Sequence, residues 1–333
     1  MTKMRKTLIL VLIVSLIGCM LIIPGCGKQQ NVAQLQNSPF NPVADKVQKL
    51  SKDLSADFWT NGKYLNTIYT SRDLFLQTKQ ARKYEIKPDL SLEVPREDDH
   101  GALFASGYTA IKRYVMDEID LTVPLDSVWK NTHEKFPEVL EQYYIHRYSL
   151  VRVYPFRNLA GIYSPRQNLM LTPDFRIAQQ QKGKSARVIW LQPQWDPYFK
   201  QMVMKGIYPI REGNELIGVL GCKVSLGGFL EACTEDDSTI TGIICRKGNL
   251  VMANPTFYSN FGLTPPMSKD GRPAVFNSIN LKELEQPHIK SLLSNIINSP
   301  YMNFNMKIGE VNYYVECRLI PEMNWVIFKM NKK

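Results

Sequence analysis

From residue 43 onward, apolar residues recur at spacings of three and four, which is the period of one helical face. The pattern is carried by Val43, Val47, Leu50, Leu54 and Phe58. An apolar stripe of this length is typical of a helix that packs one face against a core. We therefore predict a long helix over residues 42–79, with a soft point at Asn61 and Gly62, because glycine weakens a helix interior.

Two apolar runs in the middle of the chain flank a short polar turn. They cover residues 205–210 and 216–226, and the turn between them, residues 211–215, contains Gly213 and Asn214. Strand-like runs joined by a Gly/Asn turn indicate an antiparallel hairpin. An aromatic, proline-broken segment, residues 187–198, comes before this hairpin.

The pattern continues on both sides of the hairpin. Upstream we predict strands over residues 101–106, 139–145 and 150–156 and a helix from Pro124. Downstream, after Gly227 and Gly228, we predict a hairpin (241–246 with 250–255), a helix (289–297) and three strands (302–308, 312–320 and 325–329). Strands that alternate with few helices, joined by short turns, favour antiparallel sheets.

The N-terminus has the organisation of a secretory signal. Residues 1–6 are positively charged, residues 7–23 are almost wholly apolar, and the chain turns polar directly after Cys26. Such a segment is excluded from the fold. We predict a lipoprotein signal peptide over residues 1–26 and, because residues 27–41 are rich in Gln, Asn and Ser, a tether after it.

A small residue before Cys26 resembles a bacterial lipobox, in which the thiol is acylated and becomes the new N-terminus. Cys19 fits that pattern better letter by letter, but cleavage there would leave an apolar run, residues 20–24, on the mature end. A third option is an uncleaved anchor helix, for which the segment has about the minimum length. All three options place the rest of the chain outside the cytoplasm and at a membrane.

Composition narrows the function classes. The chain has 333 residues, 44% of them hydrophobic, which supports a substantial core. Its formal net charge is +10, but no run of Lys and Arg exceeds two residues. Nucleic-acid binding needs a clustered basic stripe, so we expect no nucleic-acid partner.

Catalytic and metal motifs are not recognisable. The four histidines (100, 133, 146 and 288) have no metal-ligand spacing, and no nucleophile elbow or phosphate-binding loop appears. The acidic residues 97–99 next to His100 read as a solvated loop. We expect no enzyme, metal or cofactor, with an unrecognised hydrolase as a remote alternative. Cys222, Cys233, Cys245 and Cys317 permit disulfides outside the cytoplasm, but buried thiols are favoured and no pairing can be assigned.

The aromatic block at residues 195–198, followed by the hairpin with residues 217–221, resembles the ligand-binding half of a double Cache domain. That family forms extracytoplasmic sensor modules of bacterial chemoreceptors and histidine kinases. The downstream strand pair, helix and three-strand meander resembles its PAS-like second half. The resemblance implies an α+β fold, with a long N-terminal helix, a membrane-distal module over residues 80–230 and a membrane-proximal module over residues 231–333.

The resemblance also implies a small-molecule pocket in the distal module. The residues that fall where this pocket is expected are Arg176, Trp190, Trp195, Asp196, Tyr198, Tyr208 and Lys223. Amino-acid-binding members carry an Arg-x-Trp-Tyr block, of which only Arg176 survives, and an aspartate where this chain has Lys223. A cation in place of an anion reverses the preferred ligand charge. We therefore expect a carboxylate or other anionic metabolite, held by Lys223 and Arg176 and flanked by Trp195 and Tyr198.

Two readings remain open. In the first, the chain is a lipid-anchored sensor that signals through a partner, either a transmembrane receptor or a histidine kinase. In the second, it is a structural or assembly lipoprotein whose pocket has been lost. Asp196 could pair with Lys223 and make that lysine structural, and the tryptophans and Tyr208 could belong to the sheet core.

Overall fold

The computed structural model describes residues 40–77, 85–89, 91–93, 101–181, 187–227, 239–264, 279–301 and 303–333, with side chains from residue 44 onward. The chain divides into two compact units, Met1–Asn41 and Pro42–Lys333, and the elements below belong to the second apart from the first two residues of α3. The signal peptide, both lipidation candidates, the tether, the acidic residues 97–99 with His100, and Cys233 lie outside the described residues.

The long N-terminal helix is confirmed. It forms α3, Phe40–Thr70, and a short helix α4, Arg72–Gln77, follows it. The predicted apolar stripe is buried at Val47, Leu54 and Phe58. Gly62 does not break the helix. Packing requires a glycine at this position, because a Cβ there would lie 2.5 Å from Cδ1 of Tyr208. The glycine lets the helix approach the sheet closely.

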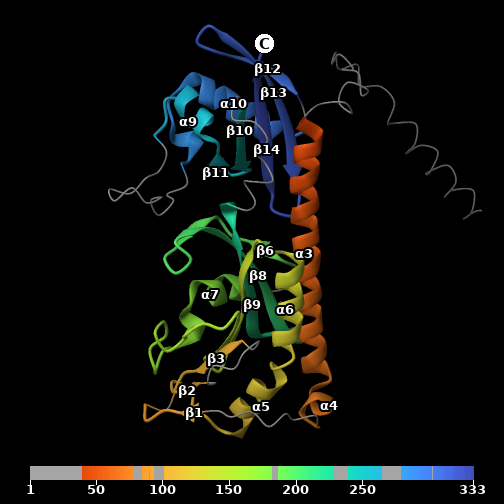
Figure 1. The fold of residues 1–333 in the computed structure, drawn as a ribbon, viewed down its shortest axis with the longest axis vertical. Coiled ribbons are helices and arrows are strands. Elements are labelled where there is room, and N and C mark those ends of the chain that lie inside the picture. The colour runs from red at the N-terminus through yellow and green to blue at the C-terminus, as the bar shows by residue number, and fades with distance from the viewer. Residues whose placement is uncertain are drawn as a thin grey trace, which may run out of the picture. The chain divides into compact units, whose positions relative to one another are not determined.

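A nine-stranded antiparallel sheet forms the first module, in the order β1-β2-β3-β5-β4-β9-β8-β6, and β7 also pairs with β8. Figure 1 labels β1, β2, β3, β6, β8 and β9 of this sheet. Its strands are β1 (Glu85–Ile86), β2 (Leu92–Glu93), β3 (Ala102–Ala105), β4 (Val139–His146), β5 (Leu150–Tyr154), β6 (Ile189–Trp190), β7 (Gln194–Asp196), β8 (Gln201–Glu212) and β9 (Glu215–Ser225). The predicted hairpin is β8–β9, closed by the pair Glu212 and Glu215 around Gly213, whose φ is +57°.

The two faces of this sheet pack against different elements. One face meets α3 together with α5 (Arg113–Leu121) and α6 (Leu125–Lys135), and there the buried Arg152 pairs with Asp126 of α6 at 3.1 Å. The other face carries an apolar cluster that includes Phe104, Tyr143, Val151, Val153, Ile207 and Val219 of the sheet and Phe175 of α7 (Pro173–Gln179). Successive strand residues alternate between these faces.

A separate five-stranded antiparallel sheet follows, in the order β11-β10-β14-β13-β12. Its elements are β10 (Ile240–Cys245), β11 (Leu250–Ala253), α9 (Pro255–Asn260), α10 (Pro287–Asn298), β12 (Phe304–Ile308), β13 (Val311–Ile320) and β14 (Trp325–Lys332). Its core joins Phe257 and Phe261 of the α9 region, Leu292 and Ile296 of α10, and Phe328 of β14. The predicted hairpin, helix and meander are confirmed, and so is the α+β class.

Three of the four cysteines outside the signal region, Cys222, Cys245 and Cys317, are buried free thiols. Burial raises the pKa of Cys222 to about 12, which makes its thiol unreactive at neutral pH. No described helix has the length and apolar character needed to cross a membrane. Over the same residues, no group of three or more His, Cys, Asp or Glu side chains is arranged to hold a metal ion.

Candidate functional site

Charged side chains gather on the face of the large sheet that also carries the α7 cluster. Glu141 of β4 lies directly across from Lys223 of β9, and Lys223 lies across from Lys205 of β8. Directly opposed residues in antiparallel strands project to the same side. Three ionisable groups from three strands therefore stand in one row on a mostly apolar surface.

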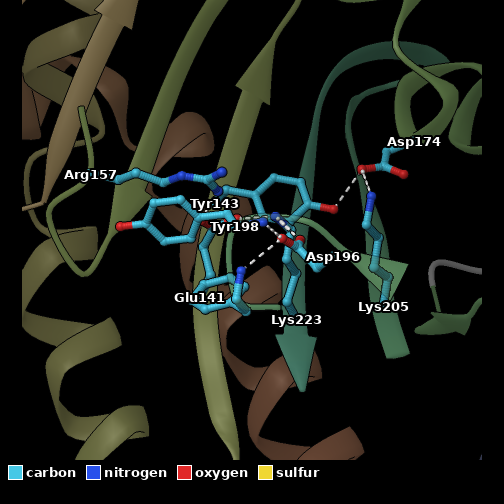
Figure 2. A network of polar contacts seen from close by, with 9 residues as sticks. Glu141, Tyr143, Arg157, Asp174, Asp196, Tyr198, Lys205 and Lys223 are labelled. Carbon is cyan, nitrogen blue, oxygen red and sulfur yellow. Dashed lines mark hydrogen bonds and ion pairs between the residues drawn. The ribbon is translucent and has the colours of Figure 1, made fainter. Parts of the chain in front are cut away.

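Lys223 lies between two carboxylates (Figure 2). Its Nζ is 2.7 Å from Oε1 of Glu141 and 2.9 Å from Oδ2 of Asp196. The three side chains are only 12%, 5% and 7% exposed, and the ring of Phe199 lies 5.6 Å from Nζ. Charges in such surroundings need partners, because desolvation of an isolated ion is costly. The pairing of Lys223 with Asp196 considered from the sequence is present, and Glu141 adds a second partner.

Asp196 is fixed by its own turn. Its Oδ1 accepts hydrogen bonds from the backbone N–H of Tyr198 at 2.9 Å and of Phe199 at 3.2 Å, which leaves Oδ2 for Lys223. Burial by itself would raise the pKa of Asp196, but the hydrogen bond and charge of Lys223 and the two backbone donors outweigh it and hold this pKa below its ordinary value. Asp196 is therefore an ionised, oriented carboxylate.

Arg157 covers the Glu141–Lys223 pair. Its Nη1 donates to Oε2 of Glu141 at 2.6 Å, and its guanidinium lies 3.8 Å from the ring centroid of Tyr198 (Figure 2). The Nε–H of Arg157 is buried and has no hydrogen-bond partner among the described residues. A guanidinium has five N–H donors and an ammonium three, so the donors at this spot outnumber the acceptors that Glu141 and Asp196 present to them.

A second polar group lies farther along the same face. The hydroxyl of Tyr143 donates to Oδ2 of Asp174 at 2.6 Å, and Nζ of Lys205 lies 3.4 Å from the same oxygen. Burial, followed by the neighbouring Asp174 carboxylate, raises the pKa of Tyr143 well above its usual range. Gly221 gives this ring its space, since a Cβ there would lie 2.1 Å from Cζ of Tyr143.

The structure brings together only part of the predicted ligand-binding set. Asp196, Tyr198 and Lys223 belong to one cluster. Trp190 and Tyr208 lie on the opposite face: Nε1 of Trp190 donates to Ser55 of α3 at 2.9 Å, and Tyr208 packs on Gly62.

The other two predicted residues also lie apart. Strand alternation directs Trp195 away from the face of its neighbour Asp196. Arg176 is exposed on α7, and no hydrogen bond or ion pair joins it to Glu141 or Asp196 in the described part of the chain. Trp190, Trp195 and Tyr208 therefore lie on the face opposite Lys223, whereas the role of Arg176 stays a prediction.

A β-bulge explains the split between Lys223 and Tyr208. Near the turn, Arg211 pairs with Leu216, but beyond the irregularity between Ile210 and Arg211 the register shifts by one residue, so that Ile210 pairs with Gly218. A shift of one residue moves every side chain of a strand to the other face relative to its partner. Without this bulge, Lys223 and Tyr208 would have shared a face.

Sequence reasoning missed Glu141, Tyr143, Arg157, Asp174 and Lys205. Glu141 could have been identified from the sequence, because a single carboxylate at a buried position of an apolar strand requires a cationic partner. No sequence pattern pointed to Arg157 or Asp174. Arg157 follows β5 in an irregular segment, and Asp174 lies in the first turn of the short helix α7. Their positions depend on tertiary contacts that no local pattern encodes.

The sequence matches no family model and no curated protein sequence. Among solved structures, the chain is similar to the ligand-binding domain of the Campylobacter jejuni chemoreceptor Tlp3 in complex with L-norvaline (10% identity, 89% of this chain, 95% of that chain, TM-score 0.41). It is also similar to the ligand-binding domain of the Pseudomonas aeruginosa chemoreceptor PctB in complex with L-Gln (12% identity, 84% of this chain, 90% of that chain, TM-score 0.41). A third similar structure is the ligand-binding domain of the Pseudomonas fluorescens chemoreceptor CtaA in complex with L-isoleucine (12% identity, 89% of this chain, 97% of that chain, TM-score 0.41). These TM-scores are too low to transfer a ligand or a residue role.

Proposed function

We propose that this chain is a membrane-attached, extracytoplasmic sensor that binds a small anionic metabolite on the Lys223 face of its large sheet. The sensor role comes from the double Cache resemblance of the sequence, with which the order of long helix, large sheet and small sheet agrees. The ligand class comes from the cluster around Lys223.

The observation that carries the ligand class is the buried Nε–H of Arg157, which has no hydrogen-bond partner among the described residues. Lys223, next to it, has two carboxylate acceptors for its three N–H donors within the described part of the chain. An unsatisfied buried donor costs about 1–3 kcal/mol. A carboxylate supplies two strong acceptor atoms and would relieve that cost, whereas a cationic ligand would add donors to a site that already has too many.

The attachment and the partner belong to the same proposal. We propose that Cys26, or alternatively Cys19, carries the lipid anchor, and that residues 27–41 link it to α3. A bound state would then pass to a transmembrane receptor or a histidine kinase. No nucleic acid, metal, cofactor or catalytic step is part of this proposal.

A second candidate is favoured by one specific observation. Three carboxylates (Glu141, Asp174 and Asp196) face three cations (Arg157, Lys205 and Lys223), and each cation has a carboxylate partner. A balanced network of this kind can simply hold strands β4, β8 and β9 and the β7 turn together. The chain would then be a structural or assembly lipoprotein without a ligand.

A thermal-unfolding screen of the purified protein separates the two candidates. The panel contains mono- and dicarboxylates, amino acids, amines and purines. A ligand of the folded state at a hundredfold excess over its Kd adds roughly 2.7 kcal/mol of stability. A carboxylate hit that is lost in Arg157→Gln and kept in Arg176→Gln supports the sensor. Stabilisation by amines alone refutes the anionic class, and a flat screen favours the structural candidate.

A further inference from the structure

A cavity of about 920 Å³ lies away from the Lys223 cluster and shares no residue with it. One wall is α3, through Ser55, Ala56 and Trp59. A second wall is the segment that leads into β6, residues 187–190, together with Gln181, and the third is the turn between β13 and β14, residues 321–324. Figure 1 shows α3 running alongside β6.

The walls are held in place by contacts of their own lining residues. Trp190 is fixed by its hydrogen bond to Ser55 and by its ring, which lies so close to Gly206 that a Cβ there would be 3.1 Å from Cζ3. In the third wall, the backbone N–H of Asn324 donates to the carbonyl of Pro321 at 3.2 Å. Met323 is buried and accepts from Ser51 of α3 at 3.7 Å. Fixed walls lower the ordering cost of binding.

The cavity offers one charge of each sign. Arg187 is exposed and Glu322 is half-buried, and neither forms an ion pair with any described residue. Oε2 of Glu322 is buried and has no hydrogen-bond partner within the same part of the chain. A buried carboxylate oxygen without a donor is unfavourable, so Glu322 is poised to accept from a cationic group.

The remaining lining is apolar and aromatic. Trp59 leaves 44% of its surface exposed, although it is a large aromatic residue on a helix whose other large side chains are mostly buried. Trp190, Ile189, Pro321 and Met323 add apolar surface around it. Pockets of this kind bind ligands with an apolar body and a few charged groups, and tryptophan faces also attract ammonium groups.

We propose that this cavity binds a small zwitterion of dipeptide to tripeptide size, with its ammonium at Glu322, its carboxylate at Arg187 and an apolar side chain against Trp59 and Trp190. A ligand with a single charge would leave either Arg187 or Glu322 without a partner. The volume lies in the upper part of the range for small-ligand pockets and exceeds what one free amino acid fills. This site is independent of the anion site at Lys223.

The test is a calorimetric titration of the full-length protein in detergent with glycyl-L-phenylalanine. Two matched ligands remove one charge each: the N-acetyl derivative lacks the ammonium, and the methyl ester lacks the carboxylate. We expect each derivative to bind about tenfold more weakly or worse, which corresponds to about 1.4 kcal/mol or more. Glu322→Gln should weaken the parent dipeptide and the ester but not the N-acetyl derivative, and Arg187→Gln should show the reverse selectivity.

Arg176→Gln serves as the control variant, because Arg176 is exposed on α7, does not line the cavity and should leave dipeptide binding unchanged. Glu322 and Arg187 lose no ion pair with any residue that the structure describes, so both variants should fold, as unchanged circular dichroism would show. Three results would overturn the proposal: no saturable binding at millimolar dipeptide, equal affinity for all three ligands, or affinities that neither variant changes.

Discussion

The Lys223→Met substitution tests most sharply whether Lys223 holds two buried carboxylates together. It removes the ammonium that lies 2.7 Å from Glu141 and 2.9 Å from Asp196 and leaves two nearly buried carboxylates facing each other. Breaking a buried pair by removing one partner typically costs about 3–5 kcal/mol. In this variant Glu141 still pairs with Arg157, and Asp196 still accepts two backbone hydrogen bonds. We therefore expect a loss at the lower end of this range, about 3 kcal/mol of unfolding free energy.

Urea denaturation at neutral pH measures this loss. Lys307→Met, at an exposed position of β12, is the matched control and should change stability by no more than about 0.5 kcal/mol. Adding Asp196→Asn to Lys223→Met should recover part of the loss, because it removes one of the two stranded carboxylates. A cost below about 1 kcal/mol for Lys223→Met, the level of an exposed ion pair, would show that Lys223 does not form a buried ionic cluster.

The pH dependence gives a second check with a definite sign. The pKa of Asp196 is lowered in the folded protein, so its contribution to stability is present above the unfolded-state pKa of about 3.9 and is lost as pH falls through the lower folded value. Lys223→Met removes the main cause of that lowering. The stability difference between wild type and variant should therefore shrink as pH falls below about 4, and a difference that widens there would contradict the account.

Three further outcomes are expected. Gly62→Ala should lower the unfolding free energy by about 1–3 kcal/mol, measured by urea denaturation, because its Cβ would enter the ring of Tyr208; an unchanged value would show that α3 does not approach the sheet so closely. Arg152→Met should cost about 3–5 kcal/mol in the same assay, since Asp126 would lose its buried guanidinium partner. Burial lowers the pKa of His146 to about 3, so wild-type stability should fall with pH from about 6.5 downward, and His146→Gln should flatten that slope.

The parts of the fold that the sequence predicted are those with a strong local period. The spacing from Val43 to Phe58 predicted α3, and the two apolar runs around Gly213 predicted β8 and β9. Such patterns can be recognised within a single segment, because side chains that face the core recur with a period of 3.6 residues in a helix and of 2 in a strand. The order of strands within each sheet was not predicted, because it depends on pairing between distant segments.

The candidate site was predicted only in part, and the reason lies in the register. Whether Lys223 shares a face with Tyr208 depends on one bulge between Ile210 and Arg211, for which the sequence gives no signal. Arg157 comes from an irregular segment after β5 and reaches Glu141 only in the folded chain. Long-range ion pairs of this kind follow from tertiary packing rather than from spacing.

The most direct test of the central claim is a calorimetric titration of the carboxylate found in the screen into wild type, Arg157→Lys and Arg176→Lys. Lysine keeps the charge of Arg157 but lacks the Nε–H that has no acceptor in the described structure. A hydrogen bond to a charged group is worth about 1.5–3 kcal/mol, so Arg157→Lys should weaken binding about tenfold or more, while Arg176→Lys leaves it unchanged. Equal affinity of wild type and Arg157→Lys, or a loss confined to Arg176→Lys, would contradict the assignment of the anion site to Arg157 and Lys223.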